Sequence, residues 1–90
     1  MEGSGSPQRL AAIDVGTNSI RLVVAEADSA ASYRVLDEER AQTRLGEGLY
    51  QSGRLGEEPM RRSLEALDRM RALAEGMGVE ETRAIATAAV

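Results

Sequence analysis

The sequence predicts a small α/β domain with the element order β-β-β-α-β, a mixed sheet and one covering helix. Three short runs of apolar or alternating residues come first, one long stretch with helical spacing follows, and a last apolar run closes the 90 residues. A strand that is reached through a helix normally lies parallel to an earlier strand. A chain of this size buries only about 60–65% of its unfolded surface, so we expect one domain of marginal stability.

The first half of the chain predicts a meander of three antiparallel strands. Residues 1–8 are rich in Gly, Ser and Pro, and we expect them to be a disordered lead-in to a domain at residues 9–90. Strands are expected at 9–14 and 19–27, and the short polar gap between them favours a hairpin. A third strand, with one exposed face, is expected within 32–45.

The second half predicts a loop, a helix and a final strand. Four glycines within residues 46–56 predict the loop. Two acids and a proline at 57–59 are a good helix start, and Gly76 and Gly78 are expected to end the helix. Residues 82–90 predict the last strand. The spacing of three and four residues predicts an apolar helix face made of Met60, Leu64, Leu67, Met70, Ala74 and Met77.

The composition excludes several kinds of chemistry. There is no His and no Cys, which removes Ser-His-Asp and Cys-His catalysis, zinc sites built on those residues, disulfides and thiol redox chemistry. A bound metal would be a hard ion with oxygen ligands, such as magnesium, manganese or calcium. Fifteen acidic against eleven basic residues give a net charge of −4, which argues against general nucleic-acid binding. No signal peptide or membrane-spanning run is apparent, so we expect a soluble, cytoplasmic protein without a membrane partner.

The turn after the first strand has the composition of an anion-binding loop. It contains Gly16, Thr17, Asn18 and Ser19, and nothing bulky. Gly16 is expected to adopt backbone angles that are closed to other residues, which lets consecutive N–H groups converge on a phosphate oxygen. The two hydroxyl groups and the carboxamide add further donors.

Two charged residues flank this turn. Asp14, at the end of the first strand, can orient water on a divalent cation that neutralises a bound phosphate. Arg21, on the same strand face as Ser19, can bind a phosphate oxygen with two hydrogen bonds. A plain hairpin, in which these residues only satisfy turn geometry, explains the same composition.

The sequence around the turn resembles a known family. Residues 13–25 are similar to the first phosphate motif of the exopolyphosphatase/guanosine pentaphosphate phosphohydrolase family. Residues 44–49, residues 53–55, the helix from 57 and residues 84–89 continue the resemblance in the same order. Sugar kinases, actins and chaperone ATPases use hairpins similar to the first motif, whereas the ordered set is far more specific.

The resemblance implies a ribonuclease-H-like domain of the actin-like ATPase superfamily, of which two close on a phosphate-rich ligand. It also implies magnesium-dependent release of terminal phosphate from polyphosphate or guanosine pentaphosphate. Asp14 would then organise the metal, and residues 16–19 would cradle the terminal phosphate. Arg21 would be a further phosphate contact at a position where family members vary.

The resemblance places the family's catalytic glutamate after residue 90, so no catalytic residue is assigned here. Glu47 lies between two glycines and is expected to serve loop solvation or a backbone hydrogen bond. Phosphoryl transfer needs a positioned water, a metal and donors on both sides of the transferred group. We therefore expect this partial N-terminal domain to bind phosphate and to hydrolyse it hardly at all.

Two other interpretations stay open. Another actin-like ATPase or a sugar kinase would use a similar hairpin and take its phosphate from ATP. A non-enzymatic module would bind phosphate or associate with itself, and an uncovered sheet face with a free edge would favour a homodimer. The sequence does not choose between polyphosphate and guanosine pentaphosphate.

Overall fold

A computed structural model describes residues 8–28 and 32–86 of the chain. Its elements follow the predicted order, with one short helix added: β1 (Gln8–Val15), β2 (Ile20–Ala27), β3 (Tyr33–Ala41), α1 (Leu49–Ser52), α2 (Glu57–Gly76) and β4 (Glu81–Ala86). Residues 1–7 of the expected lead-in and residues 87–90 of the expected last strand lie outside the described residues.

Helix α1 lies in the stretch that was expected to be a loop throughout. Gly48 and Gly53 border its single turn, and both have left-handed backbone angles, with φ of 79° and 71°. Glycine adopts these angles without steric cost, so the turn can begin and end abruptly. Two of the four glycines therefore border a short helix instead of preventing one.

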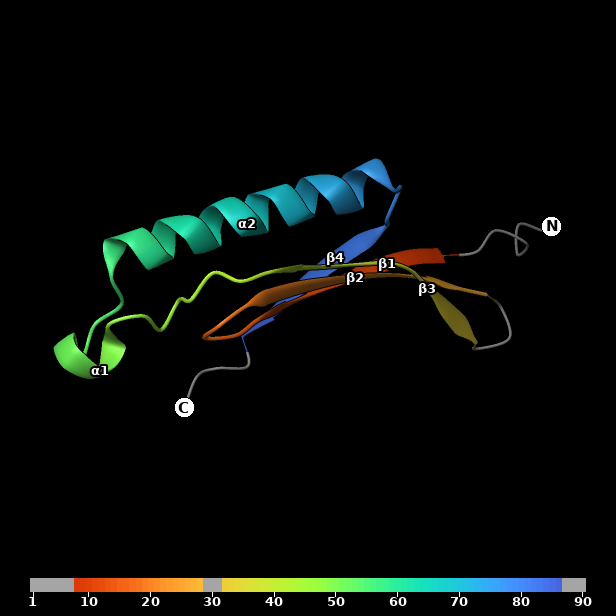
Figure 1. The fold of residues 1–90 in the computed structure, drawn as a ribbon. Helices are drawn as coiled ribbons and strands as arrows, with labels where there is room; N and C mark the ends of the chain where they lie inside the picture. Colours follow the sequence, from red (N-terminus) through yellow and green to blue (C-terminus); the bar gives the residue numbers. More distant parts are fainter. Residues whose placement is uncertain (1–7, 29–31, 87–90) are drawn as a thin grey trace.

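The four strands form one mixed sheet in the order β3-β2-β1-β4. Strands β1, β2 and β3 make the predicted antiparallel meander, and β4 lies parallel to β1. Helix α2 covers one face of this sheet, and the β1–β2 turn and α1 lie at the same end of the molecule (Figure 1). No helix among the described residues is long and apolar enough to cross a membrane.

The core lies between α2 and the face of β1 and β2 that points toward it. Alternate residues of both strands are buried there, as the period of two in a strand requires. The buried apolar side chains are Ala11, Ile13, Ile20, Leu22, Val24, Ala66, Met70 and Ala74. No aromatic side chain is among them.

The predicted apolar face of α2 is wrong in the first half of the helix. Met60 and Leu64 are 39% and 66% exposed, whereas Pro59, Ser63 and Ala66 are buried. The small side chains at 63 and 66 face the sheet, and the Ser63 hydroxyl donates to the Pro59 carbonyl at 2.9 Å, which satisfies the buried oxygen. The stripe is thus displaced by one residue, while Met70 and Ala74 are buried as predicted.

Arg9 ties the far end of the sheet to the end of α2. Its Nε donates to Glu26 on β2 at 3.0 Å, and its Nη1 donates to the Met77 carbonyl at 2.8 Å. The hydrogen bond from Arg9 lowers the pKa of the Glu26 carboxyl below its ordinary value, and a second bond, from Arg34, acts in the same direction.

The displaced stripe predicts unequal costs for two truncations on α2. Met70→Ala removes a side chain that is 1% exposed and should cost about 2–5 kcal/mol of unfolding free energy. Leu64→Ala should stay within about 0.5 kcal/mol of wild type because Leu64 is largely exposed. Urea denaturation measures both values, and an equal or larger loss for Leu64→Ala would contradict this helix orientation.

The Glu26 ion pair predicts a pH-dependent contribution to stability. Because the folded state lowers the Glu26 pKa below 4.5, this contribution is present above 4.5 and is lost as the pH falls through the folded value. Wild type should be more stable than Glu26→Gln at neutral pH, and the difference should vanish in acid. Glu39→Gln is the control, since Glu39 is exposed and makes no ion pair within residues 8–28 and 32–86. A Glu26→Gln difference that stays constant with pH would contradict the assignment.

Candidate functional site

The β1–β2 turn, residues 16–19, closes on itself through one backbone bond. The Gly16 N–H donates to the Ser19 carbonyl at 2.9 Å, directly beyond the last paired residues, Val15 and Ile20. The hairpin that the sequence predicted is therefore present, with Ser19 in the turn and not in β2.

A second segment packs its backbone against this turn. We call residues 43–47, between β3 and α1, the docking loop. The N–H groups of Thr43 and Arg44 both donate to the Asn18 carbonyl at 3.1 Å, and the Gly46 N–H donates to the Thr17 carbonyl at 3.0 Å. Three consecutive carbonyls of the turn are thus occupied by backbone donors.

These bonds fix the direction of the neighbouring N–H groups. In a trans peptide, the C=O of one residue and the N–H of the next lie in one plane and point opposite ways, and no described residue follows a cis bond. Because the carbonyls of Thr17 and Asn18 point at the docking loop, the N–H groups of Asn18 and Ser19 point away from it. Neither N–H has an acceptor among the described residues, so two adjacent donors face outward.

Gly16 contributes room, not an unusual backbone angle. The expectation that it adopts angles closed to other residues is wrong, because the positive φ values at described glycines belong to Gly48, Gly53 and Gly78. A Cβ on Gly16 would lie 3.2 Å from the Ser19 carbonyl oxygen, which is tighter than ordinary contact. A side chain at this position would crowd the bond that closes the turn.

The polar side chains of the turn are available to a ligand. Thr17 and Asn18 are exposed, and Ser19 is half-buried. None of the three makes a side-chain hydrogen bond within the described part of the chain. The turn therefore carries two hydroxyls and a carboxamide in addition to the two outward N–H groups.

The two flanking charges lie on the sheet face that α2 does not cover. Asp14 and Arg21 are directly paired across β1 and β2, and both are exposed. Arg21 Nε donates to Glu38 on β3 at 2.7 Å, so its guanidinium already has a carboxylate partner. Local periodicity does not reveal this pairing, because it predicts only that the strand within residues 32–45 has one exposed face.

The described residues contain no cluster of metal ligands. No group of three or more acidic side chains that could hold a metal ion occurs in residues 8–28 or 32–86. Asp14 places one carboxylate at this end of β1. A single carboxylate does fit a magnesium ion that keeps several waters and shares its remaining ligands with a bound phosphate.

Glu47 has a partner that the sequence did not reveal. Its Oε1 lies 2.5 Å from Nη2 of Arg62 on α2, and Nε of the same arginine donates to the Thr43 carbonyl at 3.0 Å. Arg62 follows Arg61 by about 100° around the helix, which turns it from solvent toward the docking loop. Arg61 itself pairs with Glu58 and Glu65 along α2.

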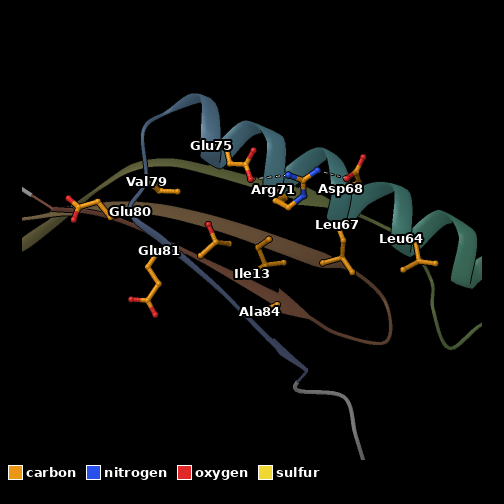
Figure 2. A pocket seen from close by; sticks show the side chains of 11 residues that line it. Ile13, Leu64, Leu67, Asp68, Arg71, Glu75, Val79, Glu80, Glu81 and Ala84 are labelled. Carbon is orange, nitrogen blue, oxygen red and sulfur yellow. Dashed lines mark hydrogen bonds and ion pairs between the residues drawn. The ribbon is translucent and has the colours of Figure 1, made fainter.

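A large pocket lies away from the hairpin. It lies beside the core, between α2 and β4, with a volume of about 600 Å³ (Figure 2). The charged side chains on its helix wall are paired with one another, Arg71 with Asp68 and Glu75. Ile13, Leu67 and Ala84 supply apolar walls, and no turn residue lines it. This pocket is therefore an open edge of the core, and the charges on its helix wall are occupied by one another.

Comparison with known proteins identifies the family. The sequence model of the Ppx/GppA phosphatase family matches residues 22–90. The chain is 37% identical over 84 residues to exopolyphosphatase 2 from Mycobacterium tuberculosis, and the match covers 90% of this chain and 26% of that protein. The chain thus spans about a quarter of the length of the curated relatives that it matches.

Solved structures agree with the sequence match. The Ppx/GppA family member from Aquifex aeolicus superposes with a TM-score of 0.85 at 28% identity, over 90% of this chain and 26% of that one. An exopolyphosphatase from Cytophaga hutchinsonii gives 0.80 at 29% identity, over 88% and 25%. The sheet and helix are therefore part of a ribonuclease-H-like domain of the actin-like ATPase superfamily, and the chain belongs to the Ppx/GppA phosphatase family.

Proposed function

We propose that these residues form the phosphate-binding part of a magnesium-dependent phosphohydrolase. Its substrate would be inorganic polyphosphate or guanosine pentaphosphate, and it would release terminal phosphate. The observation that carries this proposal is the pair of outward N–H groups at Asn18 and Ser19, which the docking loop orients. The names of the similar proteins from Mycobacterium tuberculosis and Cytophaga hutchinsonii support the same substrate class.

In this proposal the turn binds the terminal phosphate through backbone and side-chain donors. The N–H groups of Asn18 and Ser19 bind its oxygens, and the side chains of residues 17–19 add donors around them. Preformed donors that point at one spot bind an anion without having to be reorganised. The close approach of Gly16 to the Ser19 carbonyl would keep the turn closed while the ligand binds.

Asp14 would hold magnesium through its carboxylate or through a water on the ion. Magnesium usually keeps several waters and takes one or two carboxylates with substrate phosphates, so one acid at this position is enough. The bound ion would neutralise phosphate charge. Arg21 would add a weaker contact, because its guanidinium must first leave Glu38.

Hydrolysis would depend on groups outside the described residues. Phosphoryl transfer needs a residue that positions the attacking water. Glu47 is the acidic residue of the docking loop and follows Gly46, which bonds to the turn. The Glu47 carboxylate pairs with Arg62. We therefore propose that these 90 residues bind the substrate without turning it over.

A second candidate function is self-association, which the uncovered sheet face favours. Leu10 and Ile85 are 39% and 55% exposed there, and with Ala12, Val23 and Ala25 they line an apolar depression. Exposed apolar surface of this kind often marks an interface. A homodimer would remove it from water, and sedimentation equilibrium tests this over a range of concentrations.

The absence of Cys agrees with the cytoplasmic location that we propose for either function.

The phosphate-site proposal predicts which amides respond to ligand. When tripolyphosphate and magnesium are added stepwise to the ¹⁵N-labelled chain, its ¹H–¹⁵N NMR spectra should show the largest shifts at the amides of Asn18 and Ser19. Asp14→Asn should weaken binding about tenfold or more, since hydrogen bonds and contacts to charged groups are worth about 1.5–3 kcal/mol. Glu39→Gln, the same loss of one negative charge at another exposed site, should bind as wild type does. Shifts confined to other segments would contradict the site, and a preference for ATP would favour the kinase interpretation.

The division between binding and hydrolysis gives a second prediction. Phosphate release from polyphosphate by the 90-residue chain with magnesium should fall far below about 1 s⁻¹, the low end of ordinary enzyme turnover. A colorimetric phosphate assay measures it, with Asp14→Asn as the background. Turnover in the ordinary range that Asp14→Asn abolishes would contradict the proposal that the catalytic group lies outside these residues.

A further inference from the structure

We propose that Arg44 is the cationic arm of the phosphate site and that Arg62 positions the loop that presents it. This inference rests on the proposed function and adds a residue to it. The proposal follows from where the docking loop holds Arg44, from its backbone angle and from the charge balance around the turn.

The first argument is placement. The Arg44 N–H donates to the Asn18 carbonyl at 3.1 Å. The same peptide group carries the Ser19 N–H on its opposite side. The backbone of Arg44 is therefore one hydrogen bond away from the peptide group whose N–H would donate to a bound phosphate. The side chain of Arg44 is exposed and long enough to extend around the turn to an anion bound there.

The second argument is backbone strain. Arg44 has φ of 53°, and within residues 8–28 and 32–86 no other residue except glycine has a positive φ. For a residue with a Cβ this left-handed conformation costs conformational free energy. Glycine would avoid the cost. Strain of this kind is retained where the surrounding bonds impose it, and it gathers at functional sites.

The third argument is charge. Arg21 pairs with Glu38, and Arg62 pairs with Glu47, so both of these guanidinium groups are neutralised near the turn. Arg44 makes no ion pair within the described part of the chain. Its guanidinium is thus a surplus positive charge on the loop that holds the turn. Arginine can bind phosphate with two parallel hydrogen bonds.

Arg62 acts on this site through the docking loop, because its hydrogen bonds and ion pair within the described residues go to Thr43 and Glu47. Its side chain is 32% exposed and bonds to both ends of the loop, to the Thr43 carbonyl and to the Glu47 carboxylate. The loop is pressed in closely enough to bury the Thr43 hydroxyl without a hydrogen-bond partner in the structure described. Arg62 also neutralises Glu47, an acid that would repel phosphate. It is therefore a positioning residue.

The test measures tripolyphosphate affinity of the 90-residue chain with magnesium by calorimetry. Arg44→Gln should weaken binding about tenfold or more, whereas Arg69→Gln should leave it unchanged. Arg69 is the matched control because it is an exposed arginine on α2 that makes no ion pair in the described residues. Arg44→Gly should weaken binding while raising the midpoint of thermal unfolding, because it relieves the strained φ. A purely structural role predicts that affinity and stability change together.

Arg62→Gln tests the positioning role. It should weaken binding, and in the double variant with Arg44→Gln the two losses should not add, because both act on one contact. Additive losses would contradict positioning through Arg44. Unchanged affinity in Arg44→Gln, with ligand shifts still at Asn18 and Ser19, would overturn this inference and leave the proposed function standing. No ligand shift at those amides in wild type would overturn both.

Discussion

The bonds from the docking loop to the carbonyls of the β1–β2 turn are the constraint on which the rest of the site depends. Without them the turn would be an ordinary two-strand hairpin, free to rotate its peptide groups. With them the Thr17 and Asn18 carbonyls are held on one side, and planarity of the peptide sends the next two N–H groups to the other. Arg44, which donates one of these bonds, has a left-handed backbone with φ of 53°. Backbone geometry, and not a cluster of charged side chains, makes this end of the sheet suitable for an anion.

The fold serves to bring two distant segments to that position. Strand β3 ends at Ala41, opposite Ile20, so the chain leaves the sheet directly beside the turn. Helix α2 then packs its small buried side chains on β1 and β2, which places Arg62 against the docking loop. The net charge of −4 opposes the approach of a polyanion. Local donors, the Arg44 guanidinium and a divalent cation would have to overcome that repulsion.

Sequence periodicity was sufficient for the fold and insufficient for the site. Alternation and short spacing predicted the strands, and glycines marked the end of α2, because both signals are local. The face of α2 was displaced by one residue, since helical spacing does not say which of two adjacent stripes meets the sheet, and the small Ser63 and Ala66 allowed a close approach. The contacts of Arg62 and Glu47 span 15 residues. Such pairings are fixed only by the packed structure, so the sequence named the turn but missed the loop that orients it.

Amide hydrogen exchange of the unliganded chain tests this account most directly. The docking-loop bonds predict that the N–H groups of Thr43, Arg44 and Gly46 exchange slowly, while those of Asn18 and Ser19 exchange at nearly the rate of an unstructured peptide. This pattern would show that the loop N–H groups donate to the turn carbonyls and that the N–H groups of Asn18 and Ser19 are open to a ligand. Rapid exchange at the three loop amides, or protection at the two turn amides, would contradict it.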